Sequence, residues 1–177
     1  MTPAWTPVGE RPGSAGHLPL TTRTYVMPDG SHADWDIFGH ERTVAILALT
    51  PGGDVVLARQ FRPGPGLVVD ELPGGIVEDG EDVLQAAARE FAEETGYGGE
   101  LELAGTCWLA STCRTQRFVA VSRNAHVAAP GPQTGELCTP VVKSLAAFRR
   151  QLRSGQLTDV DLAYLALDHL GVLGPSV

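Results

Sequence analysis

The sequence GIVEDGEDVLQAAAREFAEETGY, residues 75–97, decides how this chain folds and what it binds. It gathers five charged side chains into a short segment that also has the pattern of a helix: Glu81, Arg89, Glu90, Glu93 and Glu94. Folding alone does not require so many carboxylates at one place. Divalent cations would explain them, because Mg2+ prefers carboxylate and carbonyl oxygens as ligands.

Local signals set the two ends of the predicted helix. Asp82 is a favourable N-cap, and Gln85 three residues later completes a capping box. Gly96 provides a natural stop at the C-terminal end. Between these ends the apolar residues recur at helical spacing and predict one buried stripe, made of Leu84, Ala87, Ala88 and Phe91.

The carboxylates on this helix have a spacing of their own. Glu90 and Glu94 are four residues apart, so their side chains lie on one flank of the helix. Like charges at this spacing repel each other unless a positive charge lies between them. We therefore expect Glu90 and Glu94 to bind Mg2+, with Mn2+ as an alternative, and Glu93 to hold a further metal ion or a water. A solvated helix face with ordinary salt bridges is the competing interpretation.

The whole stretch fits the spacing G-x5-E-x7-R-E-U-x-E-E-x-G-U, in which U is a bulky apolar residue. This pattern resembles the box of the Nudix hydrolases, which cleave nucleoside diphosphates linked to another moiety. The resemblance implies an α/β fold, namely a Nudix-type α/β/α sandwich with a mixed sheet and an N-terminal β-strand extension. It also implies that Arg89 orients a neighbouring glutamate and that the main-chain carbonyl of Gly74 binds metal.

Composition narrows the class of protein. The 177 residues predict one domain, and 13 basic against 21 acidic residues give a net charge of −8. This acidic balance argues against broad binding to nucleic acid or to membrane surfaces. Cys107, Cys113 and Cys138 form no CxxC pair, which favours reduced thiols in a cytoplasmic protein. We expect neither a leader segment nor a membrane span.

The chain divides into three predicted segments. Residues 1–20, rich in proline, form a flexible arm; residues 21–40 form a strand pair; and residues 41–177 form the Nudix domain. Further strands are expected at 43–49, 55–60, 67–72, 100–108, 117–123 and 141–143. Two helices follow, one over 144–154 and one capped by Thr158. Strands with few helices predict a mixed sheet between helices.

A narrower resemblance extends beyond the box. Arg-Gln-Phe-Arg at 59–62, Glu-Leu-Pro-Gly-Gly at 71–75, the opening stretch 21–38 and the run at 155–159 are similar to the ADP-ribose pyrophosphatases. In that group the N-terminal strands help to build a homodimer and their aromatic residues stack on the nucleobase. Trp35 is the candidate for that stacking, because an indole offers a large flat face. A core tryptophan is the equal alternative.

The same resemblance assigns the remaining site residues. Arg62 and Glu71 are expected to bind substrate, and a guanidinium suits a forked contact with phosphate. The alternative for Arg62 is a surface salt bridge with Asp70 or Glu71. This group also uses a loop glutamate after the box as general base or water positioner, and Glu136 is the acidic residue of the loop 124–139. A solvated loop residue is its alternative. With Glu93 and Arg89, Glu136 completes the predicted catalytic set.

The leading expectation is Mg2+-dependent hydrolysis of ADP-ribose to AMP and ribose 5-phosphate. Residues 111–113 read Ser-Thr-Cys where ADP-ribose pyrophosphatases often carry a proline, so another nucleotide sugar such as GDP-mannose stays an alternative substrate. A third possibility is a non-catalytic nucleotide sensor. The complete set of box carboxylates and the lack of a basic helical appendage argue against it.

Overall fold

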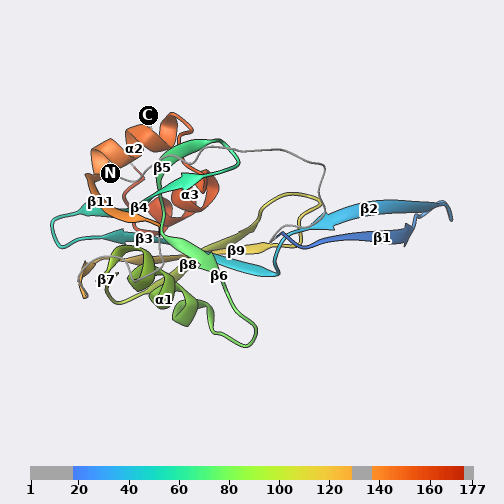
Figure 1. The fold of residues 1–177 in the computed structure, drawn as a ribbon, viewed down its shortest axis with the longest axis horizontal. Helices are drawn as coiled ribbons and strands as arrows, with labels where there is room; N and C mark the ends of the chain where they lie inside the picture. Colours follow the sequence, from blue (N-terminus) through green and yellow to red (C-terminus); the bar gives the residue numbers. More distant parts are fainter. Residues whose placement is uncertain (1–17, 129–136, 174–177) are drawn as a thin grey trace.

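The computed structural model describes residues 18–128 and 137–173, in which a mixed β-sheet lies between helices (Figure 1). The strand order is β11-β4-β3-β9-β8, with β5 paired to β4 and β6 paired to β3. Strands β3 and β9 run parallel, whereas the other pairs of this sheet are antiparallel. The strands span Arg42–Leu49 (β3), Asp54–Arg62 (β4), Leu67–Glu71 (β5), Gly74–Ile76 (β6), Glu102–Trp108 (β8), Gln116–Ser122 (β9) and Thr139–Ser144 (β11).

Helices cover both faces of this sheet, which confirms the predicted α/β/α sandwich (Figure 1). Helix α1 (Val83–Thr95) covers one face, and α2 (Leu145–Arg153) with α3 (Val160–His169) covers the other. Strand β3 is continuously apolar because it is covered on both faces. Val44, Ile46 and Ala48 pack on the α1 side, while the alternating Ala45, Leu47 and Leu49 pack on the α3 side.

Strands β1 (Leu20–Val26) and β2 (His32–Phe38) form the expected antiparallel pair and project from the sandwich (Figure 1). Every residue of β1 is exposed. The base of the pair is fixed by Phe38, whose N–H donates to the carbonyl of Thr112 at 3.2 Å. Trp35 lies opposite Arg23 and is 46% exposed, so the alternative of a core tryptophan is wrong.

Helix α1 begins and ends as predicted, but its buried face differs. The Asp82 carboxylate accepts hydrogen bonds from the main-chain N–H groups of residues 84 and 85, and Gly96 closes the helix at φ 74°. The expected stripe included Ala88, which is exposed. The buried face runs through Ala87, Phe91 and Glu94 instead, because positions i, i+4 and i+7 share one side of a helix. This face therefore carries one box carboxylate into the interior.

The start of α3 also differs from the prediction. Thr158 was expected to cap this helix, yet the N-cap is Asp159 and no side chain caps it. The Thr158 hydroxyl instead donates to Glu71 Oε2 at 2.6 Å. Sequence analysis also missed the short strands β6, β7 (Tyr97–Gly98) and β10 (His126–Val127). No helix within the described residues is long and apolar enough to span a membrane.

Candidate active site

A cavity of about 590 Å3 is lined by residues of β3, β4, β6, β9 and α1 and by the start of α3. Main-chain atoms of Gly74 and Gly75 contribute to its wall. Its charged lining consists of Arg62, Glu78, Arg89, Glu90, Arg117 and Asp159. A second cavity, of about 800 Å3, lies beside β5 and α2, and none of the predicted site residues lines it. Size alone would favour the second cavity, but the chemistry places the candidate site at the first.

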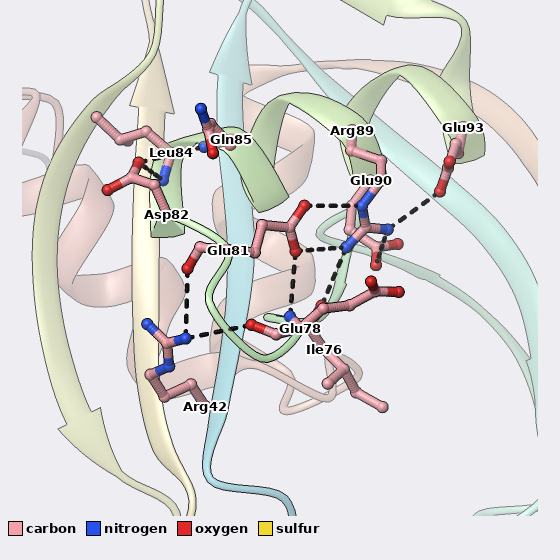
Figure 2. Close-up of polar contacts among 10 residues, drawn as sticks. All are labelled: Arg42, Ile76, Glu78, Glu81, Asp82, Leu84, Gln85, Arg89, Glu90 and Glu93. Carbon is pink, nitrogen blue, oxygen red and sulfur yellow. Dashed lines mark hydrogen bonds and ion pairs between the residues drawn. The ribbon is translucent and has the colours of Figure 1, made fainter.

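Arg89 links the loop before α1 to the carboxylates on α1 (Figure 2). Its Nε and Nη2 atoms each donate to Glu81 at 3.0 Å, and Nη1 donates to Glu90 Oε1 at 2.8 Å and to Glu93 Oε2 at 3.2 Å. Nη2 also donates to the carbonyl of Ile76 at 3.1 Å. The hydrogen bonds to Glu81 raise the pKa of Arg89, so the guanidinium stays charged. This contact set suits the orienting role that the resemblance implies.

Glu94 is a buried carboxylate of the box helix α1. It is 6% exposed, and its Oε2 accepts from the Gly74 N–H at 2.9 Å while Oε1 accepts from the Gln60 amide at 3.2 Å. Burial raises the pKa of Glu94 to about 7, and the charge of Glu90 adds to this shift. A positive charge near Glu94 would offset both effects.

Glu90 packs against a glycine. A Cβ atom added to Gly75 would lie 2.3 Å from Glu90 Oε1, closer than carbon and oxygen atoms can approach. Residue 75 must therefore lack a side chain for Glu90 to keep its position beside β6. The first glycine of the box is thus explained by a contact with one of the carboxylates.

The residues present fit a hydrated Mg2+ site. Mg2+ is usually held by one or two carboxylates and keeps several waters, and Glu90 and Glu94 supply two carboxylates beside the Gly74–Gly75 backbone. Within the described part of the chain, no three His, Cys, Asp or Glu side chains converge as a closed metal cage. Arg89 instead engages Glu81 and Glu93.

Arg62 and Glu71 are joined behind the cavity wall. Arg62 Nε donates to Glu71 Oε1 at 2.5 Å, and Glu71 is fully buried. The salt bridge expected as an alternative for Arg62 therefore exists, but Arg62 also lines the cavity. Asp70 pairs with Arg59 instead. Burial raises the pKa of Glu71, although the hydrogen bond from Arg62 opposes this shift.

The other predicted residues lie farther from this centre or outside the described chain. Glu93 is 30% exposed at its side chain and is not part of the cavity wall. Trp35 lies on the projecting strand pair and does not line the cavity of its own chain. Glu136 falls outside the described residues, as do residues 1–17 of the arm predicted at 1–20, whose last residue, Leu20, begins β1. The structure thus brings together Arg62, Gly74, Arg89, Glu90 and Glu94.

Besides Glu78, which lines the cavity, three polar residues of the site were missed by sequence analysis. Gln60 contacts Glu94 and belongs to the Arg-Gln-Phe-Arg run at 59–62. Asp159 ends the Gly-Gln-Leu-Thr-Asp run at 155–159. Both residues therefore lie in motifs that the sequence analysis used, but neither was assigned a role there. Arg117 is 5% exposed and pairs with Asp159 and Asp161 from β9. Nothing in the local pattern of β9 distinguishes Arg117 from a surface arginine.

Comparisons with known proteins place the sequence in a family. The family model of the NUDIX domain matches residues 39–151. An ADP-ribose pyrophosphatase of Bacillus subtilis (strain 168) is 38% identical over 71 residues, which cover 40% of this chain and 38% of that protein. An ADP-sugar pyrophosphatase of Mus musculus is 53% identical over 47 residues, or 27% of this chain and 22% of that protein. The chain therefore matches well under half of these relatives' length.

The fold has a solved counterpart. A crystal structure of an ADP compounds hydrolase superposes with a TM-score of 0.71 over 92% of this chain and 93% of that one, at 17% sequence identity. This likeness shows a shared fold. Because the NUDIX model covers more than half of the sequence, including the whole charged helix, the chain belongs to the NUDIX domain family.

Proposed function

We propose that this protein is a Mg2+-dependent hydrolase of the diphosphate bond in nucleoside diphosphate sugars, with Mn2+ as an alternative ion. The leading substrate is ADP-ribose, giving AMP and ribose 5-phosphate. The observation that carries the proposal is the buried Glu94 carboxylate, which accepts a hydrogen bond from Gly74, a residue that lines the cavity together with Glu90 and Arg62. The printed names of the relatives support an ADP-linked substrate. Three free cysteines support a cytoplasmic location.

Each residue has a proposed task. Glu90, Glu94 and the Gly74 carbonyl would hold the cation, which neutralises phosphate charge and lowers the pKa of a bound water. Arg62 binds a phosphate oxygen and Glu71 holds Arg62 in place. Arg89 keeps Glu90 oriented. Glu93 and Glu136 are the two candidates for the base that takes the water proton.

A product assay tests this proposal. Purified protein is incubated with ADP-ribose, ADP-glucose or GDP-mannose, with Mg2+ or with EDTA, and nucleoside monophosphate is quantified by chromatography. We expect Mg2+-dependent release of AMP from ADP-ribose. Faster release of GMP from GDP-mannose would support the alternative substrate class. Tight binding of ADP-ribose without any cleavage would favour the sensor and contradict the proposal.

Substituting Gly75 with alanine should reduce turnover more than stability. The new methyl group would displace the Glu90 carboxylate, which is the far end of a flexible side chain and can move without unfolding the protein. A misplacement of about 1 Å at a catalytic group costs about 10²-fold in rate. Gly64→Ala is the matched control, because a Cβ at Gly64 meets nothing within 4 Å. Equal kcat for the two variants would exclude the packing role of Gly75.

The strand pair β1–β2 supports a homodimer. A two-stranded hairpin is marginally stable in water by itself, and all of β1 is exposed. We propose that a second copy covers this pair and that Trp35 stacks on the nucleobase there. Light scattering should give twice the chain mass of 18.7 kDa. Trp35→Ala should raise KM about tenfold, the effect of losing one stacked base. A monomer at micromolar concentration would exclude the arrangement.

A further inference from the structure

Asp159 occupies a capping position without acting as a cap. Aspartate at an N-cap usually accepts a hydrogen bond from the main-chain N–H two or three residues later. Asp159 makes no such bond at the start of α3, and its Oδ1 atom accepts from Arg117 Nη2 instead. The side chain lines the cavity and is 23% exposed. A residue that gives up a local interaction in this way is a candidate for a functional role.

The second carboxylate oxygen of Asp159 has spare accepting capacity. The Thr158 hydroxyl lies 3.3 Å from Asp159 Oδ2 but only 2.6 Å from Glu71 Oε2. A hydroxyl has one proton to donate, so the shorter contact to Glu71 takes it. No other hydrogen-bond donor among the described residues reaches Asp159 Oδ2. Asp159, which lines the cavity, therefore has one acceptor oxygen without a strong partner among the described residues.

Arg62 lies near both Asp159 and the box carboxylate Glu94. Both Glu94 and Asp159 lie close enough to act electrostatically on the Arg62 guanidinium. Asp159 lines the same cavity as Arg62 and Glu90, so a substituent of a diphosphate bound at these two residues can reach Asp159. Asp159 lies at the start of α3, whereas the expected cation ligands Glu90 and Glu94 lie on α1.

The carboxylate of Asp159 indicates which kind of substituent can bind next to it. An ionised carboxylate only accepts hydrogen bonds, so it repels phosphate oxygens and binds hydroxyl groups. Arg117, buried at 5% exposure, partly balances the charge of Asp159 and holds it in place. We infer that Asp159 is a specificity-determining residue that accepts hydrogen bonds from hydroxyl groups of the sugar attached to the nucleoside diphosphate. This inference rests on the proposed function and adds the sugar side of its substrate.

The chain supplies a matched control for this inference. Asp161 pairs with the same guanidinium, Arg117, but its side chain is 46% exposed and does not line the cavity. Asp159→Asn and Asp161→Asn each remove one negative charge next to Arg117. A structural role in balancing Arg117 would therefore affect both variants, whereas sugar binding would affect Asp159→Asn alone.

The experiment compares two substrates that share the nucleoside diphosphate: ADP-ribose and the methyl ester of ADP, which lacks the second sugar. Asp159→Asn should lower kcat/KM for ADP-ribose about 10- to 100-fold, mainly through KM, as expected for losing a hydrogen bond to a charged group. The kcat/KM for the methyl ester should change less than about threefold. Asp161→Asn should change neither. Asp159→Ser, which can cap α3, is the second variant if Asp159→Asn is unstable.

The outcomes separate the inference from the proposed function. An equal loss on both substrates would overturn the inference, because it would place Asp159 at the nucleoside or the diphosphate. An equal effect of the two asparagine variants would overturn it as well, since Arg117 would then be the shared cause. Wild-type protein that cleaves neither substrate would contradict the proposed function and this inference with it.

Discussion

Glu94→Gln is expected to abolish hydrolysis and, in EDTA, to raise the melting temperature. Glutamine keeps an acceptor for the Gly74 N–H but removes the charge that the cation requires, so turnover should fall about 10³-fold or more. The same charge is unfavourable in the folded protein without metal. Burial raises the pKa of Glu94 to about 7, so its ionisation at pH 8 costs roughly 1–3 kcal/mol of folding free energy.

The stability that Glu94→Gln gains over wild type should increase with pH. Below the unfolded pKa of about 4.5 the carboxyl is neutral in both states, and the variant gains nothing. The gain grows as pH rises toward 7 and is complete above it. Melting curves in EDTA at pH 5 and pH 8 test this, with Glu100→Gln, an exposed glutamate, as control. A variant that is less stable than wild type at pH 8, or that keeps its activity, would contradict the assignment.

Arg62→Ala should lose both activity and stability. A second substitution, Glu71→Gln, should restore the stability but not the activity. Removing the guanidinium leaves the fully buried Glu71 with the Thr158 hydroxyl as its hydrogen-bond donor, at a cost of about 1–3 kcal/mol. Adding Glu71→Gln removes the buried charge, so the double variant should regain most of the stability. It should stay inactive, because the phosphate still lacks its forked donor. Chemical denaturation and the AMP assay measure the two quantities.

Arg59→Ala is the matched control for Arg62. Arg59 also pairs with a carboxylate across β4 and β5, but it is 43% exposed at its side chain and Asp70 keeps Lys143 as a partner. Its loss should cost less than about 1 kcal/mol and leave activity unchanged. If the double variant at positions 62 and 71 recovered full activity, Arg62 would have only a structural role.

Local signals made much of this fold predictable. The ends of α1 follow from Asp82 and Gly96, whose capping depends on neighbouring residues alone. The sandwich follows from β3, because a continuous apolar strand must be covered on both faces. The box spacing likewise placed Arg89, Glu90 and Glu94 on one helix, where Arg89 contacts Glu90 and the charge of Glu90 acts on Glu94.

Interactions between distant segments were not predictable. Ala88 is predicted on the buried face because it is apolar and falls at helical spacing with Leu84 and Phe91. The packing of α1 on the sheet buries Ala86 and Ala87 and leaves Ala88 exposed. Threonine is a favourable N-cap residue, but the Thr158 hydroxyl donates its hydrogen bond to the buried Glu71, 87 residues earlier in the chain. Asp159 and Arg117 come into contact because α3 packs on β9. A local sequence pattern cannot predict such packing between distant segments.

Manganese binding tests the central claim most directly, namely that Glu90 and Glu94 hold a divalent cation at this cavity. Free Mn2+ would be titrated by electron paramagnetic resonance against wild type, Glu90→Gln, Glu94→Gln and the exposed control Glu100→Gln. We predict binding by wild type and by the control, with affinity at least about tenfold lower in the two site variants. Equal binding by all four proteins, or none by wild type, would contradict the account.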